Sequence, residues 1–598
     1  MAEETDFNDV LENIFLSENI QCQKSYEEGY KIGCESGNPE GYHLGYHKGA
    51  ELGRELGYYL GIVSHHLENS ASNYSEKIVK QLEKVKDLID TFPRTNSEED
   101  DILGLAENIR FLSKHLNLLA KYKMNTIGQL HQKLDSTIKF LTPLLPLANC
   151  HMVEFFTENH WEKLIPYDLR KYLNDSDMND VVDQFWRNAN GDMVDNNPLS
   201  KWIHNTKSHC VILNNNYCIS TDQLQELIKS WGGTVKPQVQ ITEFMTSKKS
   251  YEVQTMSNLI ASLNSACGAT HCVEAGGGKG NLPIALTLYY NMKSLTVDCD
   301  QKTIENAEKR VKIIQKQWHA IAKRIQNGSL ENISRNINSN IHRFASTFIT
   351  KDTNFAEIIK QKFPEDSDTD VKLLLTGLHT CGNLGPDSLR IFASQPWTAA
   401  VFNVPCCYHH LNESVDDQLY DVFQQYGGDG GCGFPMSEWL RGFNLGRNAR
   451  MLAAQSIDRV VQQRQLPDTS LLYRALLQVI IKTHLPDLPL SEGKLKGISS
   501  KCQNFNDYFK MADDLLKLNM YEIIPETYLT DIQKNMNCQW KKIVIFYLLR
   551  LCLAQVIESV ILLDRLLFLF ENGFEKVYLV KLFDPVLSPR CHSIVAVR

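Results

Sequence analysis

The amino-acid sequence predicts an α/β protein built on a doubly wound sheet and preceded by an all-α segment. Two observations predict the sheet. An apolar run at 271–273 leads into a glycine-rich turn and a helix-like stretch at 283–288, and a second strand-like run follows at 294–300. A third observation predicts the helical segment, because glycine recurs at every fourth position over 29–61. At 598 residues the chain is long enough for more than one domain.

The composition is that of a globular protein with reduced thiols. Hydrophobic residues make up 43% and charged residues 22%, and the formal net charge of −9 excludes a bulk basic field for nucleic acid, although not a local basic face. The chain has 16 cysteines, an acidic and polar start, and no paired C-x-x-C zinc spacing. We therefore expect a cytoplasmic or nuclear protein, or one found in both compartments. The apolar stretch 543–570 carries four charged residues, so we expect a buried helix and no membrane contact.

The glycine repeat at 29–61 predicts a pair of packed helices. A period of four drifts slowly around a helix of 3.6 residues per turn, so the glycines form a stripe that a second backbone can approach. Each glycine costs about 1 kcal/mol relative to alanine, which implies a packed partner. Pro39 interrupts the repeat and places the turn of a helical hairpin near Asn38. Further helices are expected at 77–90 and 102–123.

Residues 7–122 resemble the deca-GX3 repeat family, small adaptor proteins of cytosolic iron–sulfur assembly, and within it the oral-cancer-overexpressed protein 1 group. The resemblance rests on the repeat, on the acidic opening at 6–11 and on the helix at 77–90. It implies a protein partner for the hairpin. Those proteins end soon after such helices, whereas this chain continues, and Met124 begins what looks like a separate protein. A fusion of two genes, or of two gene models, is one explanation.

The glycine-rich turn has the pattern of methyltransferases that use S-adenosylmethionine (SAM). Glu274 and three glycines at alternate positions form E-x-G-x-G-x-G. A dinucleotide fingerprint would need glycine at 281, which is asparagine, and the P-loop spacing also fails. The next strand is expected to end in Asp300, whose carboxylate can accept hydrogen bonds from both ribose hydroxyls. The residues predicted to hold SAM as the cofactor are Glu274, Gly276, Gly278, Gly280 and Asp300.

The helix expected at 301–325 has the most basic face in the chain, with seven lysines and arginines. Such a face is either a solvated surface or a contact for RNA. A third strand is expected at 341–350.

Cysteines and histidines gather at the ends of the next two predicted strands. The run 371–378 is followed by His379-Thr380-Cys381, and the run 398–403 is followed by two cysteines, a tyrosine and two histidines. Ligands of doubly wound sheets bind beyond the carboxyl ends of the strands, so both clusters are expected beside the glycine turn. The residues predicted to line the reaction site are His379, Cys381, Asn403, Cys406, Cys407, Tyr408 and His409.

Three chemical roles stay open for this cluster. His379 or His409 is suited to act as a general base toward a hydroxyl or amine. Cys406 follows a proline and is suited to attack a pyrimidine ring, as in cytosine-C5 RNA methyltransferases. Alternatively, the two histidines and three cysteines bind zinc. Because the adjacent cysteines Cys406 and Cys407 are awkward ligands for one ion, we rank this role last and predict no metal residues.

From about residue 124 to the C-terminus the chain is similar to the methyltransferase-like protein 25 family, also described as having an rRNA adenine dimethylase-like domain. The segments that carry the similarity are 377–382, 403–409, 433–437, 447–453, 562–565 and 582–590. The family commonly has glycine in place of Pro405, which weakens the cytosine-C5 analogy. The H-x-C-G and C-C-x-H motifs are also similar, more distantly, to those of 2′-O-methyltransferases of the tRNA acceptor stem.

Two strands are expected at the C-terminus, at 576–583 and 592–597, after a long helix. A terminal hairpin with one antiparallel strand is how the sheet of class I SAM methyltransferases ends. The predicted domains are a glycine-repeat domain (1–123), a helical region (124–250), a SAM-binding core (251–460), an insertion or lid (461–535), and a last helix with the strand hairpin (536–598).

The sequence therefore predicts a SAM-dependent methyltransferase acting on RNA or a ribosome-linked substrate. The rival hypothesis is a non-catalytic adaptor in cytosolic iron–sulfur protein assembly or ribosome biogenesis, in which the methyltransferase fold is a binding platform. A third hypothesis is methylation of protein, which the acidic composition fits equally well. The methylated atom is left open.

Overall fold

The computed structural model describes most of the chain after residue 126 and shorter pieces before it. The described residues are 23–32, most of 49–93 and 101–109, 127–191, 196–239, 244–326, 341–413 except 367, and 432–598 except 487, 489–494, 496 and 538. The backbone divides into two compact units, residues 1–126 with 226–232 and residues 127–225 with 233–598.

In the N-terminal unit, the described part of the glycine repeat is helical and packs against α3 (Glu76–Asp90), the helix predicted at 77–90. Their shared apolar core contains Leu56, Tyr59, Val63, Leu82, Val85 and Ile89. Gly53 and Gly57 are buried, as expected where a second helix approaches a glycine stripe. The hairpin turn predicted near Asn38 and Pro39 lies outside the described residues.

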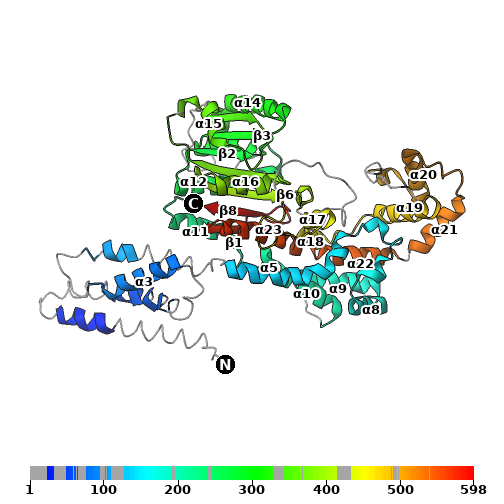
Figure 1. The fold of residues 1–598 in the computed structure, drawn as a ribbon, viewed down its shortest axis with the longest axis horizontal. Helices are drawn as coiled ribbons and strands as arrows, with labels where there is room; N and C mark the ends of the chain where they lie inside the picture. The colour runs from blue at the N-terminus through cyan, green and yellow to red at the C-terminus, as the bar shows by residue number, and fades with distance from the viewer. Residues whose placement is uncertain are drawn as a thin grey trace. The chain divides into compact units, whose positions relative to one another are not determined.

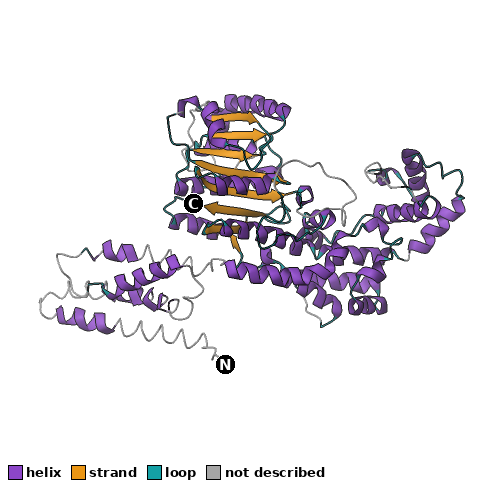
Figure 2. Ribbon diagram, viewed as in Figure 1, coloured by secondary structure: helices purple, strands orange, loops and turns teal. Residues whose placement is uncertain are grey.

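The larger unit is built around one eight-stranded sheet (Figures 1 and 2). Its strands are β1 (Cys218–Ser220), β2 (His271–Ala275), β3 (Ser294–Asp298), β4 (His342–Ser346), β5 (Leu373–Cys381), β6 (Thr398–Cys406), β7 (Lys576–Lys581) and β8 (His592–Val597). They lie in the order β1-β7-β8-β6-β5-β2-β3-β4. Every pairing is parallel except the two made by β8, which is antiparallel to both β6 and β7. A mixed α/β fold with a central sheet is therefore confirmed.

Helices cover both faces of this sheet. On one face, α15 (Phe355–Lys362), α16 (Leu384–Ser394) and α23 (Ala554–Glu571) share the main apolar core with alternate residues of β2, β3 and β4. On the other face, α13 (Asn281–Tyr290) and α14 (Gln301–Gln326) form a second apolar cluster. The side chains of these strands alternate between the two faces of the sheet, and both faces are buried. The ends of the strands are therefore where polar functional groups can lie.

Further helices precede and follow the sheet strands along the chain (Figure 1). Before β2 they are α5 (Ile127–Leu141), α6 (Leu145–Asn149), α7 (His160–Leu164), α8 (Tyr167–Asp175), α9 (Met178–Asn190), α10 (Pro198–His209), α11 (Thr221–Ser230) and α12 (Ser247–Cys267). Before α23 they are α17 (Arg447–Ala453), α18 (Ile457–Gln463), α19 (Ser470–His484), α20 (Phe505–Leu516), α21 (Glu526–Asn537) and α22 (Trp540–Leu551).

Among the described residues, one helical segment, Trp540–Glu571, is long and apolar enough to cross a membrane. Inside this protein 89% of its most apolar window is buried, as in a core helix. Its charged residues hold loops against the helix. The buried carboxylate of Asp564 accepts hydrogen bonds from the backbone N–H groups of Met436 and Ser437, and Arg550 donates to the carbonyls of Leu147 and Ala148. The charges of Asp564 and Arg550 are thus met by hydrogen bonds, which offset their desolvation, whereas the buried Arg565 lies over the ring of Tyr408.

We expect the apolar core around α23 to contribute most of the stability of the larger unit. Leu563→Ala, at a fully buried position, should lower the free energy of unfolding by about 2–5 kcal/mol, because it removes apolar contacts and leaves a cavity. Leu587→Ala is the matched control, since Leu587 is 54% exposed and its truncation should change stability by less than about 0.5 kcal/mol. Urea denaturation followed by tryptophan fluorescence measures both, and equal effects would contradict the placement of α23 in the core.

Candidate functional site

A cavity of about 710 Å³ lies at the carboxyl ends of five parallel strands, β2 to β6. Its lining residues end or directly follow those strands, apart from two residues early in α16. They are Gly276, Asp298, Cys299, Thr347, Phe348, Ile349, Thr350, Lys351, Asp352, His379, Cys381, Gly382, Asn383, Leu384, Asp387, His410 and Asn412. This edge is where open α/β sheets bind ligands, and the volume suits a molecule of nucleotide size.

The three glycines at alternate positions in the turn after β2, Gly276, Gly278 and Gly280, have different surroundings. All three have positive φ, between +52° and +69°, a conformation that side chains disfavour. A Cβ atom on Gly276 would also lie 2.7 Å from Leu384, and one on Gly280 would lie 3.3 Å from the hydroxyl of Thr296. A Cβ on Gly278 would meet no atom within 4 Å. The backbone at Gly278 therefore borders open space.

The strand predicted to end at Asp300 ends at Asp298, and this corrects the placement of the acidic residue. Asp298 is half-buried, lines the cavity, and accepts a hydrogen bond from Gly278 N at 3.0 Å. Asp300 is exposed, and its carboxylate accepts hydrogen bonds from the backbone N–H and hydroxyl of Thr303 at the start of α14. Asp300 therefore caps a helix, which lowers its pKa, chiefly through the hydrogen bond from the Thr303 hydroxyl.

Glu274 lies beneath the glycine turn and does not line the cavity. It is 4% exposed, and its Oε2 atom has no hydrogen-bond partner. Burial raises the pKa of Glu274, and the negative charge of Asp298 raises it further, whereas Lys249 opposes the shift. Asp298, and not Glu274, is therefore the acidic side chain that a ligand in the cavity would meet.

The two strands that carry the cysteine and histidine cluster run further than predicted, to Cys381 in β5 and to Cys406 in β6. Their parallel register shifts by one residue between Gly377 and Thr380, where β5 contains an extra residue. Such a bulge changes the direction of a side chain beside a site, and here it includes His379, which lines the cavity.

His379 is paired with a buried glutamate that sequence analysis did not select. Nε2 of His379 lies 3.2 Å from Oε2 of Glu252 in α12, a residue that is 1% exposed. Glu252 also accepts a hydrogen bond from the hydroxyl of Ser588 at 2.7 Å and pairs with Lys249 at 3.4 Å. Burial opposes ionisation of Glu252, but the hydrogen bonds from His379 and Ser588 outweigh it and lower its pKa to about 2. A fixed carboxylate of this kind orients an imidazole for proton transfer.

The three predicted cysteines converge. Sγ of Cys381 lies 3.0 Å from Sγ of Cys406 and 3.5 Å from Sγ of Cys407. The hydrogen bond from Cys406 is the main factor that lowers the pKa of Cys381, whereas that same interaction and burial raise the pKa of Cys406. The three sulfur atoms therefore form one interacting group.

Five of the seven predicted reaction-site residues do not line the cavity, namely Asn403, Cys406, Cys407, Tyr408 and His409. Tyr408 is fully buried and its hydroxyl donates to Glu558 at 2.9 Å, on the side of the core formed by α23. Asn403 is 1% exposed and accepts a hydrogen bond from Thr380. His409 is half-buried, and burial lowers its pKa to about 4, whereas its neighbour His410 is exposed and lines the cavity.

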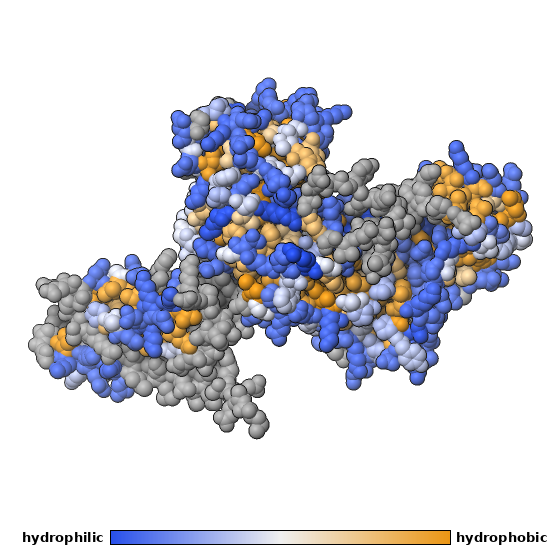
Figure 3. All heavy atoms as spheres, in the orientation of Figure 1, coloured by the Kyte–Doolittle hydropathy of each residue, from blue (hydrophilic) through white to orange (hydrophobic). Residues whose placement is uncertain are grey.

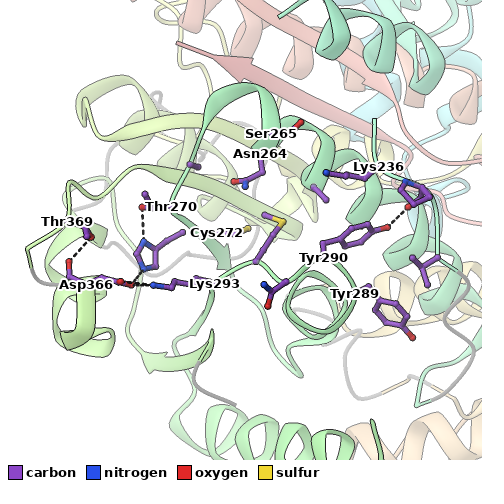
Figure 4. Close-up of a pocket in the computed structure, with 17 residues that line it drawn as sticks. Lys236, Asn264, Ser265, Thr270, Cys272, Tyr289, Tyr290, Lys293, Asp366 and Thr369 are labelled. Carbon is purple, nitrogen blue, oxygen red and sulfur yellow. Dashed lines mark hydrogen bonds and ion pairs between the residues drawn. The ribbon is translucent and has the colours of Figure 1, made fainter. Parts of the chain in front are cut away.

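A larger cavity, of about 900 Å³, lies at the opposite ends of the strands (Figure 4). There, Asp366 accepts hydrogen bonds from Lys293 at 2.6 Å and pairs with Nε2 of His271 at 3.0 Å. These polar groups satisfy one another at the amino ends of β2 and β3, which is not the edge where α/β sheets bind ligands. The smaller cavity is therefore the candidate site.

Comparison with protein families finds two matching segments. Residues 248–414, which include all of the residues that line the cavity as well as Glu252, match a family described as a methyltransferase domain. The chain therefore contains a methyltransferase domain. Residues 25–63 match a family described as the N-terminal part of the essential protein Yae1.

Two curated relatives are similar over most of the chain. It is 28% identical to probable methyltransferase-like protein 25 of Mus musculus over 595 residues, covering 78% of this chain and 96% of that protein. It is also 28% identical to the protein of the same name in Homo sapiens over 607 residues, covering 78% of this chain and 97% of that protein. The predicted similarity to methyltransferase-like protein 25 is thus confirmed. No solved structure matches the chain.

The buried Glu252 should make the methyltransferase domain sensitive to acid. Its pKa falls from 4.5 to about 2 on folding, so its ionised form stabilises the fold fully above pH 4.5, and this contribution disappears as the pH falls to about 2. Glu252→Gln should therefore lower stability at pH 7 and flatten its pH dependence between pH 4.5 and 2. Urea denaturation at a series of pH values measures this, with the exposed Glu522→Gln as control. If the stability of Glu252→Gln fell with pH as steeply as that of the wild type, the low pKa assigned to Glu252 would be refuted.

Proposed function

We propose that the chain is a SAM-dependent methyltransferase whose cofactor binds in the cavity at the carboxyl ends of β2 to β6. The observation that carries the proposal is the arrangement at this edge: the glycine turn, the strand-end Asp298 and the Glu252–His379 pair meet at one cavity. The strand order, with β8 antiparallel between β6 and β7, supports the class I methyltransferase arrangement within a doubly wound sheet.

The residues present fit SAM, which carries a positive charge on sulfur and on its amino group. The half-buried Asp298 places a carboxyl group at the cavity, and the open space beside Gly278 lets a ligand approach the backbone. Asp298 would accept hydrogen bonds from the ribose hydroxyls. Phe348, which is 75% exposed although it is a large apolar side chain, would stack on the adenine.

The bound cofactor would supply an electrophilic methyl group, and the protein would supply a nucleophile-activating base. His379 is the favoured base, since it lines the cavity and Glu252 fixes its ring. When Nε2–H donates to Glu252, Nδ1 is left as the nitrogen that accepts a proton from a substrate hydroxyl or amine. Cys406 is disfavoured as a nucleophile, because it is buried and its pKa is raised.

We propose RNA, free or in a ribosomal particle, as the substrate class. The exposed side of α14 carries lysines at 302, 309, 312 and 316, and hydrophilic residues predominate over α14, at the top of Figure 3. Arg310 of the same helix donates to the backbone carbonyl of Lys279 in the glycine turn, so this basic face adjoins the cofactor edge. An rRNA adenine dimethylase-like activity would be one form of such a function.

A second candidate function is that of a non-catalytic adaptor in iron–sulfur protein assembly. It is favoured by the match of residues 25–63 to the Yae1 N-terminal family beside a methyltransferase domain. Cofactor binding separates the two candidates, because an adaptor has no need of SAM.

SAM binding should depend on Asp298 and not on Asp300. Calorimetry on the full chain should give micromolar binding, which Asp298→Ala weakens at least about 30-fold through loss of the ribose hydrogen bonds. Asp300→Ala is the matched control two residues away, and it should keep wild-type affinity while losing about 1 kcal/mol of helix capping. No binding by folded wild-type protein would favour the adaptor, and a larger loss in Asp300→Ala would restore the assignment made from sequence.

Methyl transfer to RNA should depend on the basic face of α14. With tritiated SAM, total cellular RNA should become labelled and purified protein fractions should not. Lys309→Glu combined with Lys316→Glu should reduce labelling on the order of tenfold through lost phosphate contacts, with SAM affinity unchanged. Label found only in protein would overturn RNA as the substrate.

A further inference from the structure

We propose that Cys381, Cys406 and Cys407 bind one zinc ion, with a fourth coordination position open to the cavity. Among the described residues, these three cysteines form the group of metal-ligating side chains that converge. Their sulfur atoms lie within 4.8 Å of one another. The proposal is independent of SAM, because none of its ligands is needed to hold the cofactor.

The sheet itself brings the thiols together. Cys381 and Cys406 are the last residues of neighbouring parallel strands and are direct partners in the β5–β6 register. Their sulfur atoms lie 3.0 Å apart. In a tetrahedral site with zinc–sulfur bonds of about 2.3 Å, the sulfur atoms are about 3.8 Å apart, so a small rotation of each side chain accommodates the ion.

The backbone at Cys407 removes the objection that adjacent cysteines cannot share an ion. Cys407 adopts the left-handed conformation, with φ 46° and ψ 50°, which is uncommon for a residue with a side chain. In an extended strand its side chain would point to the opposite face from Cys406. The turn instead brings its sulfur atom to 3.5 Å from that of Cys381.

These thiols also lack the backbone partners that several other cysteines of this protein have. Cys210, Cys502 and Cys552 each donate to the backbone carbonyl four residues earlier. In the described structure, the sulfur atoms of Cys381, Cys406 and Cys407 have hydrogen bonds only with one another. A thiol is a weak donor and a weak acceptor, so these mutual contacts stabilise the cluster only weakly. A soft metal ion bound by three thiolates supplies the missing interaction.

The open position follows from the exposure of the three ligands. Cys406 is buried, whereas Cys381 is exposed and lines the cavity, so the side of the cluster away from the sheet faces the site. Three protein ligands with one free position are typical of reactive rather than purely structural zinc sites. The free position would take a water molecule or a nitrogen or sulfur atom of the substrate.

The test is the zinc content of the full-length chain, measured by inductively coupled plasma mass spectrometry after gel filtration. We expect about one zinc per chain, falling below about one-tenth in Cys381→Ser, Cys406→Ser and Cys407→Ser. Cys299→Ser is the matched control, because Cys299 is exposed in the same cavity but lies outside the cluster, and it should keep its zinc.

Wild-type protein that stays free of zinc after anaerobic incubation with zinc chloride and a reductant would overturn the proposal. So would a disulfide between Cys381 and Cys406 that persists under those conditions, or zinc retained in all three serine variants. If a variant does not fold, cobalt-substituted wild-type protein decides: sulfur-to-cobalt charge-transfer bands support three thiolate ligands, and their absence contradicts them. SAM affinity on the same samples shows separately whether the proposed function holds.

Discussion

Parallel pairing of β5 with both β2 and β6 is the constraint on which the candidate site depends. It aligns the carboxyl ends of strands that are far apart in sequence, so that Gly276, His379 and Cys406 reach one edge of the sheet. The extra residue in β5 between Gly377 and Thr380 then sets the direction of His379. Long-range contacts complete the arrangement, because Glu252 joins α12 to both His379 and Ser588.

Local sequence patterns were sufficient for the parts of the fold that depend on neighbouring residues. The glycine turn, the α3 helix and the terminal strands follow from glycine spacing, helical periodicity and β-branched composition, and the structure contains each of them. The acidic residue was misplaced because Asp298 and Asp300 stand two apart where a strand meets a helix. Both a ligand and a helix N-terminus favour a carboxylate at such a junction. Asp298 and Asp300 can be told apart only when the residue at which the strand ends is known.

The remaining differences come from contacts that sequence spacing does not report. Tyr408 was assigned to the reaction site with its neighbours, but its hydroxyl meets Glu558, 150 residues away. Glu252 was missed because it lies 127 residues from His379 and has no local motif. The convergence of Cys407 with Cys381 required a left-handed residue after a strand, which no propensity predicts for cysteine.

The central claim is that the strand-end cavity, and not the larger one in Figure 4, holds SAM. Ultraviolet cross-linking of methyl-tritiated SAM to the full chain, followed by peptide mapping, tests it most directly. The account predicts label in the peptides that contain 276–299 and 347–352, with unlabelled SAM competing it away. Label confined to the peptides around Lys293 and Asp366 that line the other cavity, or no competable label, would contradict it.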